Sequence, residues 1–316
     1  MAVSTTSTLS ANMYEYYVRT LLKVLQPRLQ LYKLGKKTSL PKNTGKQVKW
    51  LLYAKLASST SALTEGTNPS ETSLTSSNVT ATVAQYGQYA KVSDLLSFTS
   101  IDDTIKEHAE IFGKAGAESV EDLIVAQLDS ALTARRVNAR ADDDSIVAGD
   151  VITMKEFLKS QIALKNSFVG PHEMGNYMAV LHADNEYDIL TETNPSGWLP
   201  ASQYIGEMQK GIIRGEIGRM FGMRFLTSDK MNKADNASSI SVHNNYLIGE
   251  ECFGVVEIAP KGGRPGVDMI VKGHDSGGQA NPLNMYGTVG YKLRGFVAKN
   301  FAAARGILLK GATSFA

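Results

Sequence analysis

The side chains that could bind a metal ion or act in catalysis are sparse in this chain of 316 residues. A zinc site needs histidine, cysteine or carboxylate ligands at characteristic spacings, such as the two histidines of an HExxH helix. His172 precedes Glu173, but the next histidine lies ten residues after His172 and fits no such spacing. We therefore interpret all five histidines as structural or surface residues: His108, His172, His182, His243 and His274.

Nucleophilic and phosphate-binding motifs are also missing from the sequence. Cys252 is the single cysteine, which excludes an intrachain disulfide and a multi-cysteine metal cluster, and we expect it to be a small buried apolar residue. No GxSxG motif occurs, and the glycines of residues 211–219 lack the Gly-Lys-Ser/Thr ending of a phosphate loop. The GGRPG stretch at residues 262–266 lacks the strand-to-helix context of a dinucleotide site.

Three consecutive aspartates, Asp142, Asp143 and Asp144, are the remaining candidate for binding a cation. A solvated acidic turn is the simpler interpretation of them. The sequence therefore predicts no catalytic residue, no cofactor and no metal site, and it favours a protein that is not an enzyme. A soluble enzyme with an unfamiliar site stays open as an alternative.

The charge balance limits the partners that this chain can have. Thirty-three basic residues face thirty-one acidic ones, a net charge of +2, whereas a dedicated nucleic-acid binder normally concentrates basic residues on one face. The balance does not exclude a surface that lies beside nucleic acid. The first ten residues lack the basic start and apolar core of a secretory signal, and no apolar run approaches the ~18 residues of a membrane span. We expect a soluble protein made in a reducing cytoplasm, with no membrane partner.

The most informative pattern is a long polar segment between two segments that favour strands. Residues 46–55 and 79–92 are rich in Val, Thr, Tyr and Trp. Between them, residues 58–78 contain twelve Ser or Thr among twenty-one residues and have little apolar surface to bury. This pattern predicts a hairpin that projects beyond its own subunit and is received by a neighbour. A disordered linker is the alternative interpretation.

The residues after the hairpin predict one long helix. It begins near Thr99, with Ser100 and Asp103 as a capping box, and its apolar residues keep helical spacing through about 35 residues. Gly113 and Gly116 predict a local bend in this helix.

A shorter amphipathic pattern precedes the hairpin at residues 11–26, and Pro27 ends or bends it. A membrane-surface helix is an alternative interpretation of this pattern and of the basic residues 33–46 after it. The polar face of the pattern is not especially basic, so that alternative is the weaker one.

Residues 151–275 have the pattern of alternating helix and strand. Thr153 and Glu156 form a second capping box before a helix, and a short buried strand starts at Tyr177. Asp184 is expected to cap the helix that follows this strand. Further strands are predicted at residues 247–258 and 266–272, and around Val289, Tyr291 and Leu293.

The order of arm, hairpin, long helix, mixed region and returning strands resembles the major capsid proteins of tailed bacteriophages with the Hong Kong 97-type fold. Four motifs resemble more closely a podovirus-associated, N4-like family of these shell proteins. The motifs are Thr64-Glu65-Gly66 with Pro69 and Leu74-Thr75, residues 79–87 with Ser93-Asp94, residues 215–219 with Gly222 and Arg224-Phe225, and Asn281-Pro282-Leu283 with residues 287–292. The resemblance extends over essentially the whole chain, although the family more often has Asp at the position of Asn281 and Trp at that of Tyr291.

The resemblance implies an α+β chain with the Hong Kong 97-type phage capsid fold. In that fold an N-terminal arm, an extended β-hairpin loop, a long spine helix, a peripheral domain and an axial domain are combined. The expected ranges are 1–38 for the arm, 39–98 for the hairpin loop, 99–150 for the peripheral domain with its spine helix, 151–282 for the axial domain, and 283–316 for the return to the peripheral domain.

The implied function is that of a major capsid protein that self-assembles into hexamers and pentamers of an icosahedral shell around double-stranded phage DNA. In such a shell the hairpin lies across the adjacent subunit. The candidate subunit-interface residues are Trp50, Glu65, Gly66, Tyr86, Tyr89, Arg214, Glu216 and Arg219. The alternative is an encapsulating compartment that packages a cargo enzyme.

The implied partners are copies of the same chain, a separate scaffolding protein, a portal and, as an option, a decoration protein. A separate scaffolding protein is expected because the chain starts directly with the arm. Packaged DNA would lie nearby without being read, and the virion capsid would be the location after synthesis in a bacterial host cytoplasm. Lys46, Lys49 and Lys55 lie in the hairpin, but nothing identifies an asparagine acceptor, so no covalent cross-link is predicted.

Overall fold

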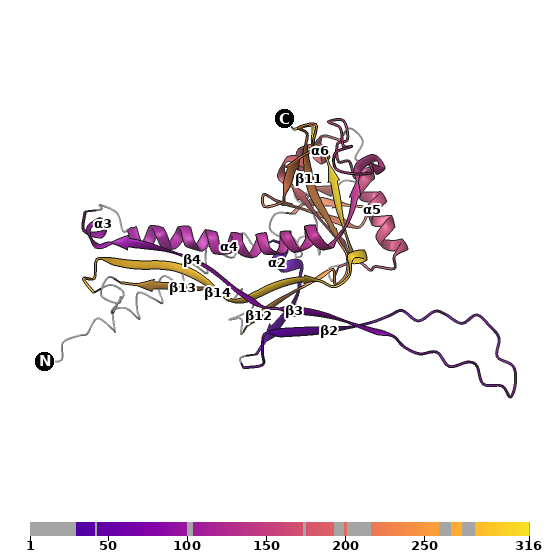
Figure 1. The fold of residues 1–316 in the computed structure, drawn as a ribbon. Helices are drawn as coiled ribbons and strands as arrows, with labels where there is room; N and C mark the ends of the chain where they lie inside the picture. The colour runs from indigo at the N-terminus through magenta and orange to yellow at the C-terminus, as the bar shows by residue number, and fades with distance from the viewer. Residues whose placement is uncertain are drawn as a thin grey trace.

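A long helix, α4 (Thr104–Ala131), runs along a long strand, β14 (Tyr286–Asn300), and together they set the long axis of the molecule (Figure 1). The fold is seen in a computed structural model, which describes residues 30–41, 43–99, 104–172, 175–192, 199–200, 216–258, 267–273 and 282–315. The expected helix at residues 11–26, the capping pair Ser100 and Asp103, and Arg214 lie outside the described residues.

The helix α4 confirms the predicted long helix over 28 residues, a length of about 42 Å. A separate short helix, α3 (Asp94–Thr99), lies where the sequence predicted the long helix to begin. The bend predicted at Gly113 and Gly116 does not interrupt α4, which continues through both. A Cβ atom at Gly116 would lie 3.3 Å from Cδ2 of Tyr291, so the small residue lets the helix approach β14 closely. The buried apolar residues of α4 keep the predicted helical spacing: Ala109, Ala117, Val120, Ile124, Val125 and Leu128.

The strand β14 is the centre of a five-stranded sheet against which α4 packs. It pairs antiparallel with β4 (Ala84–Ser93), β12 (Phe253–Ile258) and β13 (Val267–Lys272), and β12 pairs in parallel with β1 (Lys36–Leu40). Leu293 and Phe296 of β14 are buried in the same core as the apolar face of α4 and the short helix α2 (Leu31–Leu34). This sheet and the long helix form one elongated body.

A second body lies beside the C-terminal end of α4 (Figure 1). Among the described residues its sheet has eight strands, in the order β5 (Thr133–Arg136), β15 (Gly306–Gly311), β11 (Ser241–Ile248), β6 (Tyr177–His182), β9 (Met223–Ser228), β8 (Glu216–Met220) and β7 (Leu199–Pro200), with β10 (Lys233–Asp235) paired to β11. All six residues of β6 are buried, as expected of a central strand covered on both faces. The helix α5 (Met154–Asn166) packs Phe157 edge-on against Phe225 at 5.4 Å, and α6 (Ala183–Thr191) follows β6.

The predicted hairpin is confirmed as β2 (Gln47–Tyr53) and β3 (Ser76–Thr82), which pair antiparallel from Gln47 opposite Thr82 to Tyr53 opposite Ser76. Residues 79–92 form β structure as predicted, but they belong to two strands. The strand breaks at Val83, where β3 leaves the hairpin and β4 joins the five-stranded sheet. Val83 is buried, and its N–H donates to the carbonyl of Lys46 at 3.0 Å.

The two predicted helix caps differ from the structure, although both helices are present. Thr153 makes no side-chain capping bond, and the N–H of Glu156 donates to the backbone carbonyl of Thr153 at 3.1 Å. The N–H of Met154 donates to Glu192 at 2.9 Å. The cap of α6 is His182, whose Nδ1 accepts the N–H of Asp184 at 3.1 Å. Neither helix therefore begins with the side-chain bond that its sequence pattern favours.

Strands from one expected domain range belong to more than one sheet. The predicted strand at residues 247–258 is two strands, because β11 ends at Ile248 and β12 begins at Phe253 after a turn in which Glu251 has a φ of 47°. The strands β11 and β12 belong to different sheets. Both β12 and β13 fall in the range expected for the axial domain, yet they pair in the sheet of β14. The division of the chain into domains stays a prediction.

Candidate functional site

The stem of the hairpin is anchored to its own subunit. Val48 and Trp50 of β2 pack with Ala81, Val83 and other apolar residues of a small cluster that includes β1 and β12. The ring of Trp50 lies edge-on to Phe301 at 4.9 Å, and its Nε1–H donates to Thr38 Oγ1 at 3.3 Å. Trp50, a candidate interface residue, therefore contacts its own chain.

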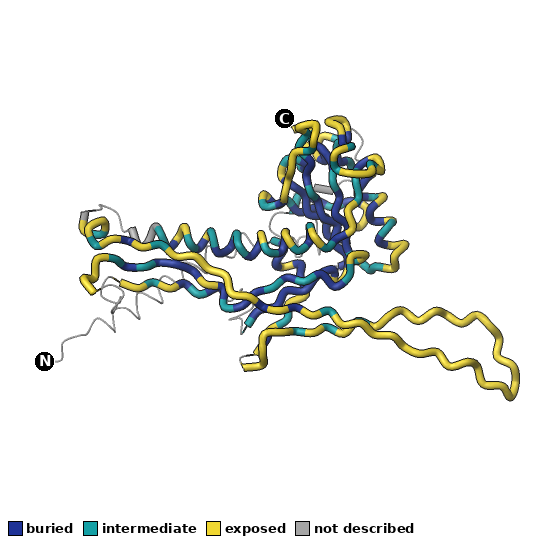
Figure 2. The backbone as a smooth tube through the Cα atoms, viewed as in Figure 1, coloured by how far each residue is buried: buried dark blue, intermediate teal, exposed yellow. Residues whose placement is uncertain are grey.

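Beyond the stem the hairpin projects from the molecule, and every residue from 53 to 78 is exposed (Figure 2). Glu65 and Gly66 form the turn at its tip, where Gly66 has a φ of 78° that favours glycine. The N–H of Thr67 donates to the carbonyl of Thr64 at 3.1 Å and closes this turn. The large apolar side chains that the hairpin exposes are Leu51, Tyr53, Leu56, Leu63 and Leu74.

One contact joins the base of the projecting segment to the second body. The ammonium of Lys55 lies 3.5 Å from the ring centroid of Phe168, a cation–π arrangement. Phe168 is exposed and follows α5, with a φ of 57°. The contact helps to fix the direction in which the hairpin projects from the subunit.

A groove of about 450 Å³ lies on the exposed face of the five-stranded sheet. Tyr86 and Tyr89 of β4 line it together with Ile270, Lys272 and Lys292 of the neighbouring strands. Tyr89 leaves 69% of its surface exposed, and it pairs with Gly290 on β14. A Cβ atom at Gly290 would lie 2.5 Å from the carbonyl oxygen of Gln88, so only glycine permits this close strand pairing.

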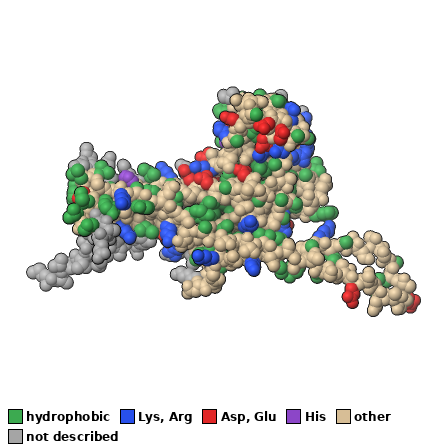
Figure 3. Space-filling view, viewed as in Figure 1, with side chains coloured by type: hydrophobic (Ala, Val, Ile, Leu, Met, Phe, Trp, Pro, Cys, Tyr) green, Lys and Arg blue, Asp and Glu red, His purple; other side chains and the backbone are tan. Residues whose placement is uncertain are grey.

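The outer part of the hairpin, residues 56–78, and the groove carry opposite charges. Residues 56–90 contain Glu65 and Glu71 but no Lys or Arg, and the acidic side chains lie at the hairpin tip (Figure 3). The groove is lined by Lys272 and Lys292 and by no carboxylate among the described residues. The two surfaces lie far apart within one chain, since the groove is on the sheet and the tip projects away from it (Figure 1).

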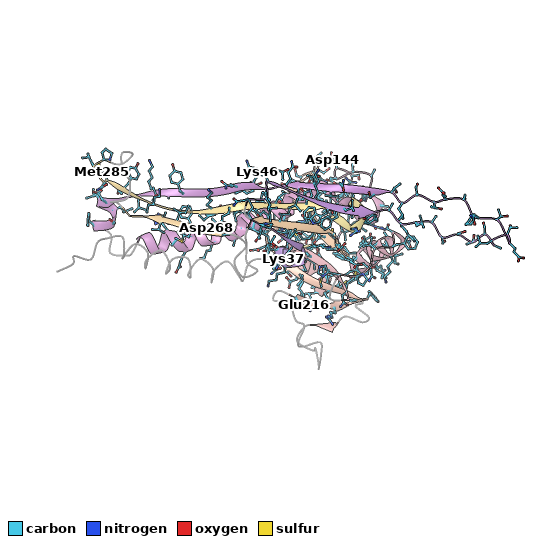
Figure 4. The ribbon with its side chains drawn as sticks, turned by 90° about the horizontal axis from the view of Figure 1, so that it is seen from below. Lys37, Lys46, Asp144, Glu216, Asp268 and Met285 are labelled. Carbon is cyan, nitrogen blue, oxygen red and sulfur yellow. The ribbon has the colours of Figure 1, made fainter. Side chains whose placement is uncertain are left out.

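The candidate residue Glu216 lies inside the second body. Its carboxylate accepts hydrogen bonds from Nε (2.9 Å) and an NH2 group of Arg224, and both side chains are almost fully buried. Arg219 Nε lies 3.5 Å from the same carboxylate. Figure 4 places Glu216 on the opposite side of the molecule from Asp144. These candidates are joined to each other rather than to the hairpin, and Arg214 lies outside the described residues.

The acidic turn is more engaged than the sequence predicted. Asp143 pairs with Arg136 and with Lys310, each at 2.6 Å. Burial opposes ionisation of Asp143, but the hydrogen bonds from these two cations hold its pKa below the ordinary value. The carboxylates of Asp142 and Asp144 accept backbone N–H groups at 2.8 Å and 3.0 Å. The three aspartates therefore stabilise a loop through contacts within the protein.

Cys252 is buried, as predicted, and burial raises the pKa of its thiol to about 12. The ring of His172 is buried beside the carbonyl of Leu34, 2.9 Å from Nε2. His182 and His243 are also buried, but they meet beside Asp184, which the sequence analysis missed. No spacing signals this meeting, because only the pairing of β6 with β11 brings the two histidines together.

The comparisons with known proteins agree with the fold. Residues 77–307 match a family described as phage capsid protein, a range that includes three of the four sequence motifs and leaves out the hairpin tip. No curated protein matches the sequence. Among the described residues, no helix is both long and apolar enough to cross a membrane.

Solved capsid structures share this architecture. The capsid protein of Ralstonia phage GP4 is similar with a TM-score of 0.69 and 13% identity, covering 89% of this chain and 87% of that chain. The capsid protein of cyanophage Pam1 gives 0.63 and 14%, covering 86% of each chain. A virus-like particle from Pyrococcus furiosus gives 0.53 and 10%, covering 94% of this chain and 99% of that chain.

At these identities the structural likeness shows the fold, and it confirms the predicted Hong Kong 97-type fold. The family match extends over well more than half of the chain and supports a structural, shell-forming role. The prediction of an N4-like subtype is a finer statement than this match and stays a prediction. The chain belongs to the phage capsid protein family, and it is a major capsid protein that assembles with copies of itself into a shell.

Proposed function

We propose that the hairpin of each copy docks into the groove on the five-stranded sheet of an adjacent copy. The observation that carries this proposal is the exposure of the hairpin: Tyr53, Leu63 and Leu74 each leave at least 70% of their surface exposed. Large apolar side chains that a projecting segment leaves in solvent gain free energy when that segment contacts another molecule. A hairpin this polar gains little by folding back on its own body, so the second molecule supplies its partner.

The groove has the chemistry to receive such a hairpin. Tyr86, Tyr89 and Ile270 offer apolar contact area, and Lys272 and Lys292 offer positive charge to Glu65 and Glu71. Opposite charges steer the encounter and fix the register of the bound segment. Glu65, Gly66, Tyr86 and Tyr89 thus remain the proposed interface residues, while Trp50, Glu216 and Arg219 support the subunit itself.

Repeated around a shell, this contact would link each copy to the next in pentamers and hexamers. Many modest contacts that form together hold far better than each alone. The Ser- and Thr-rich tract bends at little cost, which would let one sequence fit non-equivalent positions. In this assembly the sheet of β14 with α4 would serve as the peripheral domain and the eight-stranded sheet as the axial domain.

The remaining parts of the proposal follow from the family. The subunit would be made in the cytoplasm of a bacterial host, assembled with a separate scaffolding protein and a portal, and retained in the virion. A decoration protein is an optional further partner. Double-stranded DNA would lie against the shell without being read in sequence, which the net charge of +2 permits. We propose no catalytic role and no cofactor.

A charge-exchange experiment tests the docking. The double variant Glu65→Lys with Glu71→Lys should fold normally but fail to form closed shells, because it places positive charge against Lys272 and Lys292. The variant Lys272→Glu with Lys292→Glu should fail in the same way, and combining all four changes should restore shells. Electron microscopy and sedimentation report the outcome.

The control is Lys165→Glu, which reverses an exposed lysine on α5 outside the groove and should leave assembly unchanged. Normal shell yield from the Glu65→Lys, Glu71→Lys variant would contradict the docking. If the variant with all four changes folds but forms no shells, the hairpin tip contacts a surface other than the groove.

The likeness to the Pyrococcus furiosus virus-like particle supports a second candidate, a compartment that encloses a protein cargo. Genome-length DNA extracted from purified particles would support the phage capsid. Particles that hold a co-purified enzyme and no such DNA would support the compartment.

A further inference from the structure

Four side chains meet at the start of α6, in the eight-stranded sheet. His182 is the last residue of β6, and Asp184 lies in the first turn of α6. His243 lies on β11, and Lys233 is directly opposite it on β10. The neighbouring positions of β6, β10 and β11 therefore bring two imidazoles, a carboxylate and an ammonium to one place.

The carboxylate of Asp184 is the centre of this group. Its Oδ2 lies 3.0 Å from His243 Nε2, 3.2 Å from Lys233 Nζ and 3.5 Å from His182 Nδ1. One ligand atom from each histidine and one from the carboxylate all lie within 4.8 Å of one another. Ligand atoms around a tetrahedral ion with bonds of about 2.1 Å are separated by roughly 3.4 Å, so little movement would bring these three onto one ion.

The surroundings fit an ion that enters from one side. His182 and His243 are 7% and 1% exposed, and their rings meet edge-on at 4.6 Å, which fixes their orientation. The side chain of Asp184 is 24% exposed and that of Lys233 is 54% exposed, so the group opens to solvent beside the lysine. Two imidazoles and one carboxylate are donors that suit zinc and similar divalent transition metals rather than calcium or magnesium.

Lys233 shows that this place already attracts a cation. Its ammonium contacts the oxygen that a metal would use, yet the side chain is half exposed and can turn into solvent. An exposed ion pair of this kind is worth little, so its loss is a small cost. His182 Nδ1 accepts the N–H of Asp184, and this hydrogen bond caps α6. A metal ion bound to Nδ1 would take the place of this hydrogen bond.

We propose that His182, Asp184 and His243 bind a divalent transition-metal ion of the zinc class, and that Lys233 holds the position of that ion when no metal is present. The bound ion would join β6, α6 and β11 and would have a structural role. This site goes beyond shell assembly and does not depend on the docking of the hairpin.

The test uses Co²⁺ as the probe, on the full-length subunit before assembly and after treatment with a chelator. The wild type should bind one equivalent with the visible absorption of Co²⁺ held by nitrogen and oxygen ligands, and Zn²⁺ should displace it. His243→Ala should weaken binding by more than about 100-fold, because even residues that only support a ligand contribute about 10- to 100-fold. Lys233→Gln should strengthen binding by up to about fivefold, since it removes the competing ammonium.

His108→Ala is the control, because His108 lies on α4 outside this group and its loss should leave binding unchanged. Lys233→Gln keeps all three ligands, so it remains informative if His243→Ala does not fold. Absence of Co²⁺ absorption in both the wild type and Lys233→Gln overturns the proposal. Binding that persists unchanged in a folded His243→Ala, or that weakens in Lys233→Gln, overturns it equally.

Discussion

Glu121 is a buried carboxylate on α4 that holds the segment leading into β1. It accepts the backbone N–H groups of Gln30 at 3.2 Å and Leu31 at 3.3 Å, and it is 2% exposed. Burial raises the pKa of Glu121 to about 7, although the two N–H groups lower it, and the nearby Asp229 and Asp122 raise it further. A carboxyl group at the centre of the fold therefore titrates near neutral pH.

The raised pKa of Glu121 predicts a stability that falls with rising pH. The pKa of Glu121 in the folded state exceeds the ordinary 4.5. Its protonated form therefore adds to the free energy of unfolding fully below about pH 4.5, and this addition is lost as the pH approaches 7. A shift of this size corresponds to up to about 3 kcal/mol. Glu121→Gln should therefore be more stable than the wild type at pH 8 and of similar stability at pH 5.

Urea unfolding of unassembled subunits at several pH values measures this difference. Glu118→Gln, on the same helix and partly exposed, is the matched control and should give no such trend. If the free energies of unfolding of Glu121→Gln and the wild type differ by the same amount from pH 5 to pH 8, the raised pKa of Glu121 is contradicted.

Single residues were the hardest part to predict from the sequence. The burial of Cys252 was predicted correctly, because a lone cysteine in such a chain is usually a small apolar residue. The partners of Glu121 lie 90 and 91 residues away, and those of Asp184 come from three different elements. No local pattern encodes such contacts. Thr153 does not act as a side-chain cap either: the N–H of Glu156, which such a cap would have bonded, donates to the backbone carbonyl of Thr153 at 3.1 Å.

At the scale of elements, the stem of the hairpin packs in the core of the subunit, whereas the projecting part does not. The stem shares an apolar cluster with Leu40 and Val256, whereas Leu63 and Leu74 are 73% and 70% exposed. An apolar residue that is exposed in the folded subunit contributes little to the free energy of unfolding. The same residue can still contribute to the contact with a neighbour.

Leu63→Ser combined with Leu74→Ser should thus change the free energy of unfolding of the isolated subunit by less than about 0.5 kcal/mol while lowering the yield of shells. Leu40→Ser is the matched comparison: it removes a leucine that is 7% exposed and should cost about 2–5 kcal/mol. Chemical unfolding and light scattering give the two readouts. Normal shell yield from the double variant would show that these leucines take no part in assembly.

The elements themselves were largely predictable where their pattern was long and regular. The apolar residues of α4, over 28 residues, recur with the spacing of a helix, and those of β14, over 15 residues, alternate as in a strand. A pattern of that length indicates one type of element clearly. The sequence did not show where one run contained two strands, as at Val83 and at Glu251. Both sites are places where the chain passes from one sheet to another, and only the tertiary pairing decides where it turns.

At the scale of the whole molecule, motif order predicted the fold better than any single motif did. Three of the four motifs lie inside the matched range, and solved capsid structures cover most of the chain. The layout of the sheets was not predictable in the same way. The strand β14 gathers β4, β12 and β13 from three separate parts of the sequence, and such long-range pairing leaves no mark on the sequence near each strand.

Residues 56–90 contain no lysine or arginine, so trypsin cannot cleave at the tip of the projecting hairpin. A protease that cleaves after glutamate meets Glu65 and Glu71 on a fully exposed segment, the kind of site where nicking occurs first. Free subunits should thus be cut by the second enzyme at the tip and spared there by the first. Within closed shells both glutamates should be protected, as mass spectrometry of the fragments would record. Equal cutting in the two states would mean that the tip stays in solvent after assembly.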